Sequence, residues 1–298
     1  MVAKFEIVND SGVKKLEELV TAEERKVLTE MRDKGYDPSS MAEFMKSISN
    51  KRSNIKRRYS IGSFHAKLLI FGDPHMGNIN YKPDFFSFMV KTSKEEKVDL
   101  VLCTGDIFDG WYQNRPSSIF EQNAIGFDQQ MKLAVNELSK FDKPLYFITG
   151  NHSYNTFVRG AGVEAGPYLE DKLCHMGLEA HYLGNGEGDV SLGSGTKIRL
   201  LHPDGGTAYA ISYKSQKIVE SLTGGEKPNM LLIGHFHKAE YIIYRNVHVL
   251  QTATLCGQTK FMKGKGIPAH IGFWIVDVYS KKGGEISRIK PEYFPAYK

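Results

Sequence analysis

The chain has 298 residues, of which 41% are hydrophobic and 24% charged, and this composition is that of a globular protein with a full core. Its formal net charge of +5 permits a polyanionic partner but does not require one. No apolar run approaches the roughly 18–20 residues that cross a bilayer, and residues 1–6 contain no apolar signal sequence, so we expect a cytoplasmic protein with no membrane partner.

Residues 1–64 are predicted to form a small helical accessory segment. Apolar residues recur there at helical spacing, and Thr21 with Glu24 forms a capping box at the start of one helix. Residues 51–58 then contain five lysines or arginines and no acid. Three short helices with a basic third one resemble a helix-turn-helix, whose basic helix would lie against phosphates. A solvated basic surface, or a basic linker, is the alternative interpretation.

Residues 65–298 are predicted to form one main domain. Short apolar runs alternate with helix-like segments, which indicates an α/β fold with helices covering a sheet. After residue 240 strand-like runs follow one another without a long helix, which indicates a second, more antiparallel sheet packed on the first as a sandwich. The predicted helices cover residues 83–96, 118–139, 163–176 and 206–223, and the predicted strands cover 66–72, 98–103, 144–149, 180–183, 196–202, 229–234, 241–244, 247–250 and 272–278. The glycine-rich stretch 184–188 is interpreted as a turn.

The cysteines of the chain are Cys103, Cys174 and Cys256. They are odd in number, far apart and set among apolar residues. We therefore expect buried thiols in a reducing compartment rather than disulfides or a zinc site.

Five predicted strands end at polar side chains that could hold a metal ion. The carboxyl ends of strands in an α/β sheet form the edge where ligands bind. A single Gly-Asp, or one histidine behind a strand, is common by chance, but five such pieces in order predict a shared metal site. In chain order these residues are Asp73 and His75, Asp106 and Asp109, Asn151 and His152, His202, and His235 and His237.

This mixture of carboxylate, amide and imidazole ligands favours Mn, Fe, Zn or a similar ion over an all-oxygen site. The set is large enough for two adjacent ions, which need a bridging carboxylate because two close cations repel each other. Such a pair attracts phosphate, acidifies a shared water and stabilises the entering and leaving oxygens of a displacement. The remaining histidines show no such pattern and are interpreted as structural; they are His65, His175, His181, His248 and His270.

The order Asp-x-His, Gly-Asp-x-x-Asp, Gly-Asn-His, His and Gly-His-x-His resembles the calcineurin-like metallophosphoesterase superfamily over about residues 66–240. The resemblance implies two mixed β-sheets packed as a sandwich flanked by helices, with residues 65–298 as the catalytic domain. It also implies two divalent ions, for which Mn is favoured and Fe, Zn, Ni or Mg are alternatives, and a metal-bound hydroxide as nucleophile.

The resemblance further assigns a role to each site residue. One ion would be held by Asp73, His75, Asp106 and His237. Asp106 would bridge to the second ion, which Asn151, His202 and His235 complete. His152 would protonate or stabilise the leaving oxygen, and Asp109 would orient His152.

Two positions depart from the patterns of the superfamily. Ser153 stands where an acid often follows Gly-Asn-His, which removes a carboxylate near His152 but no metal ligand. Gly110 stands where the protein-phosphatase branch has an arginine, which argues against that branch.

The basic segment and the positive net charge favour a phosphodiesterase acting on nucleic acid, similar to the DNA-repair nuclease branch. A phosphatase or phosphodiesterase for a small nucleotide, a metabolite or a phosphoprotein is the alternative within the superfamily. A nucleic-acid-binding module with a structural metal site is the alternative from another class.

Overall fold

The computed structural model describes residue 33 and residues 57–58, 64–112 and 116–296. Contacts divide the chain into residues 1–55 and residues 56–298, and the second unit is described here. The predicted helix-turn-helix and residues 51–56 lie outside the described residues, apart from Asp33, which is helical. The predicted domain boundary between residues 64 and 65 stays a prediction. In the described part of the chain, every helix is too short or too polar to cross a bilayer.

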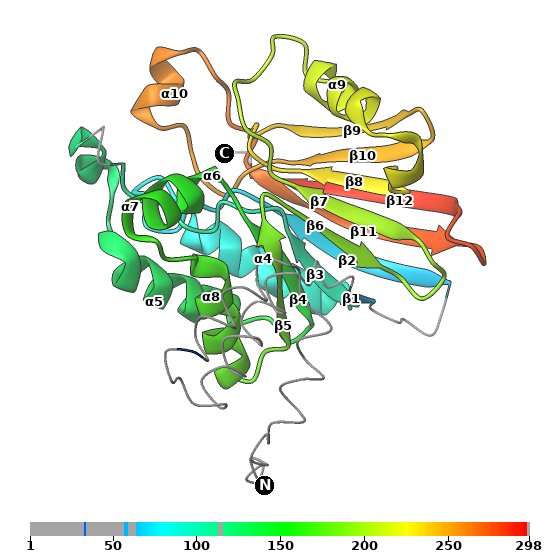
Figure 1. Cartoon of the computed structure of the whole chain (residues 1–298), viewed down its shortest axis with the longest axis horizontal. Coiled ribbons are helices and arrows are strands. Elements are labelled where there is room, and N and C mark those ends of the chain that lie inside the picture. Colours follow the sequence, from blue (N-terminus) through cyan, green and yellow to red (C-terminus); the bar gives the residue numbers. More distant parts are fainter. Residues whose placement is uncertain (1–32, 34–56, 59–63, 113–115, 297–298) are drawn as a thin grey trace, which may run out of the picture. The chain divides into compact units, whose positions relative to one another are not determined.

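Two six-stranded mixed sheets form the centre of this unit (Figure 1). Sheet A contains β1 (Arg57–Arg58), β6 (Glu187–Ser191), β7 (Lys197–Leu201), β8 (Met230–Ile233), β10 (Val247–Thr252) and β9 (Ala239–Tyr244), in that order. Sheet B contains β12 (Ile286–Pro295), β11 (Gly272–Ser280), β2 (His65–Phe71), β3 (Leu100–Cys103), β4 (Leu145–Thr149) and β5 (Ala180–Asn185). The strands β2, β3, β4 and β5 are parallel, as are β7, β8 and β10, so their carboxyl ends share an edge within each sheet. The predicted α/β fold with two mixed sheets is confirmed.

The central strands are buried on both faces, which is why they read as continuous apolar runs. Leu68 and Ile70 of β2 point toward sheet A, where they pack in one cluster with Leu200 of β7. The alternate residues Leu69 and Phe71 face the helices on the other side of sheet B. The main core therefore lies between the two sheets, with a second core under the helices.

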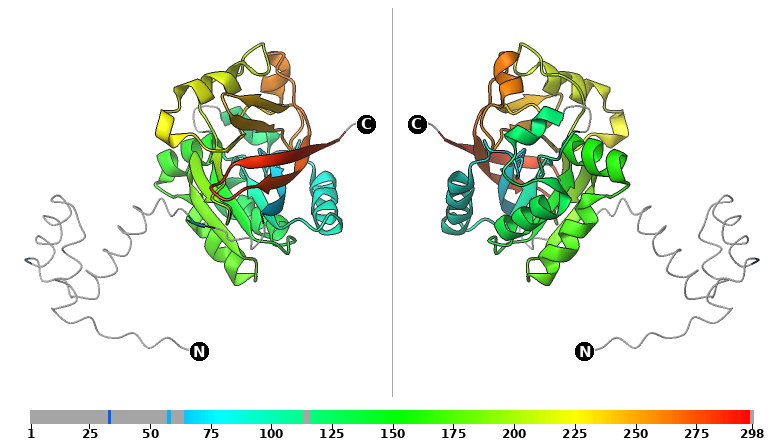
Figure 2. Two further views of the ribbon diagram at one scale, coloured as in Figure 1. Left: turned by 90° about the vertical axis from the view of Figure 1, so that its right-hand side faces the viewer. Right: turned by 90° about the vertical axis from the view of Figure 1, so that its left-hand side faces the viewer.

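Helices cover the outer faces of both sheets (Figures 1 and 2). Helices α4 (Pro83–Glu95), α5 (Gly126–Leu138) and α8 (Ala165–His175) contribute apolar residues to the core on the outer face of sheet B. Helix α9 (Tyr213–Ser221) packs on sheet A through Val219. After β4, α6 (Asn151–Ser153), the π-helix η2 (Tyr154–Val158) and α7 (Arg159–Ala161) follow one another without a break. The remaining helices are η1 (Pro116–Glu121), η3 (Gly224–Glu226) and α10 (Lys260–Gly264).

Several predicted elements are wrong in extent. The helix predicted over 118–139 is two pieces, η1 and α5, and Phe120 in η1 is 81% exposed. The helix predicted over 206–223 begins only at Tyr213. Within the stretch 184–188, only Gly186 lies between β5 and β6, so the chain passes from sheet B to sheet A at that residue.

The prediction that all three cysteines are buried is wrong for one of them. Cys103 and Cys256 are buried as expected, but Cys174 is exposed. Its place near the end of α8 leaves it at the surface, while Leu173 beside it faces the core. All three thiols are free.

Candidate metal centre

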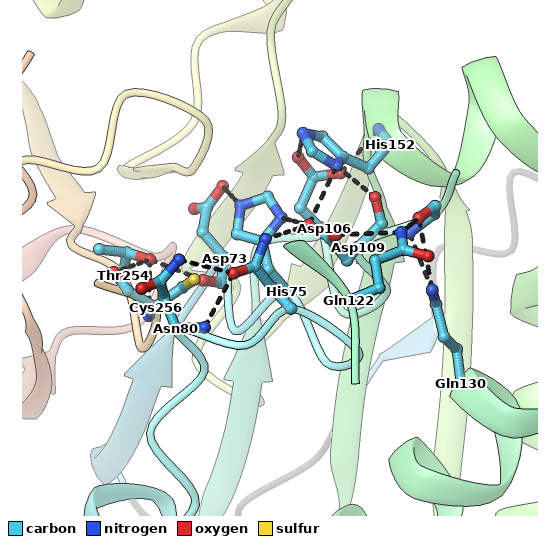
Figure 3. Close-up of polar contacts among 12 residues, drawn as sticks. Asp73, His75, Asn80, Asp106, Asp109, Gln122, Gln130, His152, Thr254 and Cys256 are labelled. Carbon is cyan, nitrogen blue, oxygen red and sulfur yellow. Dashed lines mark hydrogen bonds and ion pairs between the residues drawn. The ribbon is translucent and has the colours of Figure 1, made fainter. Parts of the chain in front are cut away.

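The nine predicted site residues come together beyond the carboxyl ends of the strands β2, β3, β4, β7 and β8. Seven of them line one cavity of about 370 Å³. The other two, Asp73 and His202, are 0% and 5% exposed and lie behind the lining residues. Figure 3 shows part of the cluster, with His75 beside Asp106, Asp109 and His152.

The loops that carry these residues have an uncommon backbone. Asp73, His75, Asp106, His235 and His237 all have φ between 43° and 76°, in the left-handed region that side chains other than glycine seldom adopt. Hydrogen bonds between neighbouring loops hold this conformation, because the Asp73 amide donates to the carbonyl of Gly105 at 3.1 Å and the His75 amide donates to that of Asp106 at 3.0 Å. The loops are therefore set by their neighbours as well as by their own sequence.

Glycines precede the ligands because the backbone passes very close to neighbouring side chains. A Cβ added at Gly105 would lie 2.7 Å from Nδ1 of His202, and Gly105 itself has φ +104°. A Cβ added at Gly234 would lie 2.7 Å from the carbonyl oxygen of Thr104. Only glycine allows the loops to approach this closely.

Asp73, His75 and His237 form the first group of ligand atoms. The Nε2 atoms of His75 and His237 face each other at 3.0 Å, and Nε2 of His237 is 3.5 Å from Oδ1 of Asp73. Nδ1 of each ring is buried with no hydrogen-bond partner among the described residues. For the two Nε2 atoms to share a hydrogen bond, one neutral ring would have to accept there and carry its proton on Nδ1. Two facing imidazoles beside a buried carboxylate therefore fit a divalent ion better than they fit each other.

Asp106, His202 and His235 form another group, which Asn151 joins. Nε2 of His202 is 3.0 Å from Oδ2 of Asp106 and 3.0 Å from Oδ1 of Asn151, and Nδ1 of His235 is 2.8 Å from the same Asn151 oxygen. The other ring nitrogens are used elsewhere, because Nδ1 of His202 donates to the carbonyl of Thr104 at 2.8 Å and Nε2 of His235 donates to that of Gly205 at 2.6 Å. When the rings are neutral, Nε2 of His202 and Nδ1 of His235 carry lone pairs that face the oxygens of Asp106 and Asn151. Lone pairs that face one another in this way repel, and a cation between them removes the repulsion.

Burial and neighbouring charges shift the pKa values of the residues in this group. Burial lowers the pKa of His202, but the carboxylates of Asp106 and Asp73 outweigh it and raise that pKa to about 9. Burial would raise the pKa of Asp106, but His202 and His152 outweigh it and hold the pKa well below its usual value. Burial, together with the nearby His202, lowers the pKa of His235. In the metal-free protein, a proton on His202 therefore balances the carboxylate that a metal would otherwise neutralise.

Asp106 lies between the two groups. It also belongs to a third group of ligand atoms with His75 and His152, and His75 in turn belongs to the first group. This position suits the predicted bridge between two ions. The assignment of individual ligands to individual ions stays a prediction.

His152 contacts Asp109 through the main chain rather than through the carboxylate. Its Nδ1 donates to the carbonyl oxygen of Asp109 at 2.5 Å, whereas Oδ1 of that residue is 3.8 Å away. The same Oδ1 is 3.6 Å from Nδ1 of His75, so the carboxylate lies between two imidazoles. Although burial would raise the pKa of Asp109, the nearby His75 and His152 outweigh it and lower the pKa. The described contact between the two residues is therefore made by the Asp109 main chain, and the orienting role of Asp109 stays a prediction.

Several supporting residues gave no signal in the sequence. The Asp109 carboxylate accepts from Nδ2 of Asn78 at 3.3 Å and from Nε2 of Gln122 at 3.2 Å. Thr254 donates its hydroxyl to the carbonyl of Asp73 at 2.7 Å. Their residue types carry no ligand pattern, and only the fold brings them to the site. Phe261, which stands between Lys260 and Lys263, also lines the cavity, and these neighbouring basic and aromatic residues are visible in the sequence.

Comparisons of the chain with known proteins gave structural similarities at low sequence identity and one family match. Among solved structures, the chain is similar to an archaeal phosphodiesterase (14% identity, 76% of this chain and 99% of that one, TM-score 0.42) and to the phosphoesterase YfcE from E. coli (14%, 75% and 98%, 0.40). It is also similar to zinc-complexed Vps29 from Entamoeba histolytica (14%, 77% and 98%, 0.38). Similarity at this level says nothing about what this chain acts on. None of the curated protein sequences compared with the chain matches it.

The sequence of residues 66–239, more than half of the chain, matches the family described as calcineurin-like phosphoesterase. This range spans all nine site residues, from Asp73 to His237. The family implies divalent metal ions, and the two groups of ligand atoms fit them. The chain therefore belongs to the calcineurin-like phosphoesterase family and is a phosphoester hydrolase.

Proposed function

We propose that this protein is a metal-dependent phosphodiesterase that acts on nucleic acid through a dinuclear centre. The observation that carries the proposal is the cluster of ligand atoms around Asp106, beside His152, in one cavity. Asp73, His75 and His237 would hold one ion with Asp106, which bridges to a second ion held by Asn151, His202 and His235. Mn²⁺ suits this mixture of nitrogen and oxygen ligands, as do Fe, Zn and Ni.

When bound, the two ions would supply positive charge for the phosphate oxygens and lower the pKa of an attacking water. The chain itself supplies His152 for the leaving group. Its Nδ1–H is held by the Asp109 carbonyl, so a protonated ring presents Nε2–H to the cavity. The Asp106 carboxylate lies 3.9 Å from Nε2 of this ring. His152 would thus deliver its proton to the leaving oxygen.

The charge of the chain supports nucleic acid as the substrate. The net charge is +5, and five lysines or arginines occur within residues 51–58 without an acid. Phosphate backbones bind through such charges. A small nucleotide or metabolite ester is the second candidate, because a cavity of about 370 Å³ falls within the range of small-molecule sites.

The proposal is tested by incubating the Mn²⁺-loaded protein with end-labelled single- and double-stranded DNA and resolving the products on a gel. We expect metal-dependent cleavage that His235→Ala abolishes. His152→Asn should lower turnover by about 10²–10⁴-fold while two metal ions per chain remain bound. Loss of metal in His152→Asn would show that His152 is a ligand and not the acid. Hydrolysis of bis(4-nitrophenyl) phosphate with no cleavage of DNA would favour the second candidate.

A further inference from the structure

The cavity has a wall that lies outside the residues matched by the family. Residues 255–270, here called the wall segment, join β10 to β11 and include α10. Figure 1 shows α10 standing clear of the two sheets. The family match ends at residue 239, so the wall segment lies outside the matched range.

The wall segment is fastened to the metal loops at both of its ends. At its start, the Thr254 hydroxyl donates to the carbonyl of Asp73 at 2.7 Å. At its end, the His270 amide donates to the carbonyl of His237 at 2.9 Å. The two ends also bond to each other, because the Thr254 amide donates to the His270 carbonyl at 3.0 Å. The position of the wall is therefore set by two predicted metal ligands.

Hydrogen bonds within the wall segment hold it in one conformation. Nε2 of Gln258 donates to the carbonyl of Ile267 at 2.7 Å and closes the loop at its base. Thr259 caps α10 by accepting from the Met262 amide at 3.3 Å. Met262 is only 7% exposed, so its side chain fills the space beneath the loop.

The face that the wall segment turns to the cavity is apolar, and its surface is basic. Phe261, Met262 and Ile267 line the cavity, and Phe261 remains 54% exposed. The segment contains three lysines, Lys260, Lys263 and Lys265, all exposed, and no acid. Apart from the site carboxylates, the acid that lines the cavity is Glu121. An exposed aromatic ring among cations, beside a phosphoester site, matches a ligand with a flat ring and phosphate charges.

We propose that Phe261 is a specificity residue on which the base of a nucleotide stacks while its phosphate lies at the metal centre. The proposal rests on the proposed function and names the substrate chemistry of the same site. Stacking of a base on an aromatic side chain strengthens binding by about tenfold or more. The three lysines would favour the neighbouring phosphates without selecting the base.

The test compares two ligands that differ only by the base, adenosine 5′-monophosphate and ribose 5-phosphate. Each is titrated by calorimetry into the full Mn²⁺-loaded chain. All proteins carry His152→Asn, so that bound ester is not consumed. With Phe261 intact, we expect the adenosine ligand to bind about tenfold more tightly. Phe261→Ala should bring this ratio close to one, and Phe261→Tyr should restore it.

Phe64→Ala is the matched control. Phe64 is 57% exposed, close to the value for Phe261, and precedes β2 at the end of the strand far from the site. This variant should keep the tenfold ratio. Tighter binding of a 5′-phosphorylated oligonucleotide than of the mononucleotide would identify a strand as the source of the base, and the reverse would identify a free nucleotide.

Two results would overturn the inference while leaving the proposed function intact. One is a ratio near one although both ligands bind to the chain with Phe261. The other is a tenfold ratio that persists in Phe261→Ala. Failure of both ligands to bind to a chain that holds Mn²⁺ would also overturn the inference, whereas the DNA-cleavage assay decides the proposed function separately.

Discussion

Metal binding should release a proton from His202, and the amount follows from the structure. The pKa of this ring is raised to about 9, so at pH 7.5 roughly 97% of the metal-free chains carry a proton there. Because Nδ1–H donates to the carbonyl of Thr104, the proton that must leave is the one on Nε2, which faces Asp106. Each chain that fills this site should release about one proton from His202.

The other predicted ligands with displaced pKa values should release few protons at pH 7.5. The pKa of His235 is lowered, so that ring is already neutral, and the lowered pKa values of Asp73 and Asp106 mean that both carboxylates are already ionised. Release from His202 should therefore fall as pH rises through 9. Below pH 9, the affinity of this site for the metal ion should weaken about tenfold for each unit by which the pH falls.

Calorimetric titration of Mn²⁺ in buffers with different ionisation enthalpies measures this release per bound ion. His202→Asn should lower the release by about one proton per chain, which is the share assigned to this ring. His248→Asn is the control, because burial lowers the pKa of His248 and the ring lies away from the cavity, bonded to the Tyr241 hydroxyl at 2.7 Å. Release near zero at pH 7.5 in the unsubstituted protein, or release that does not decline between pH 8 and pH 10, would refute the charge assigned to His202.

Three further predictions concern the loops and the core. Gly105→Ala should reduce metal affinity by at least tenfold in a protein that still folds, because the new Cβ would lie 2.7 Å from Nδ1 of His202; unchanged metal content by mass spectrometry would contradict this. Asp189→Asn should lower the free energy of unfolding at pH 7 by about 1–2 kcal/mol, because the carboxylate accepts from Nε and Nη2 of Arg199 at 2.7 and 3.1 Å. The Arg199 and Lys197 charges outweigh burial and lower the pKa of Asp189, so its contribution is present above pH 4 and lost as pH falls through the folded pKa; a urea series from pH 7 to pH 3 should show a flatter acid limb in the variant. Phe86→Ala should cost about 3–5 kcal/mol in urea unfolding, because this fully buried ring packs against other aromatic rings in the core under α4, and a cost below 1 kcal/mol would be contrary to that packing.

The position of the site at the edge of the sheets was predictable because each apolar strand and the polar residues after it are adjacent in the sequence. An apolar run such as Leu68–Phe71 predicts a buried strand, and parallel strands bring whatever follows them to a common edge. The ligands in the loops after these strands could therefore be placed together without knowledge of the intervening helices. The left-handed backbone of Asp73 could not be predicted, because a hydrogen bond from a different loop holds it.

Where the prediction was wrong, contacts distant in sequence override local pattern. Helix 118–139 is interrupted because Gln122 bonds to the Asp109 carboxylate and the Asn123 amide donates to the carbonyl of Gly77 at 2.8 Å. These contacts favour a loop at the metal site over the helix that the apolar spacing suggests. The atom of Asp109 that binds His152 likewise depends on how two loops meet, which residue types do not reveal.

The strand β12 was missed for a different reason. It is an edge strand that alternates half-buried residues with charged ones such as Arg288 and Lys290, and it contains Pro291. An edge strand tolerates proline and solvent, so it carries little of the apolar signal on which strand prediction depends.

The two ends of the wall segment, residues 255–270, lie next to each other, so the interior of this loop can be replaced. Thr254 pairs with Ile271 as a short parallel bridge, so the two ends of the stretch are already joined before any of its interior is specified. A loop closed in this way can change in length at little entropic cost to the rest of the fold. Grafting other sequences between Gln258 and Ile267, whose hydrogen bond closes the loop at its base, should therefore change which esters the cavity admits, while the Leu255 amide still donates to the carbonyl of Asp73.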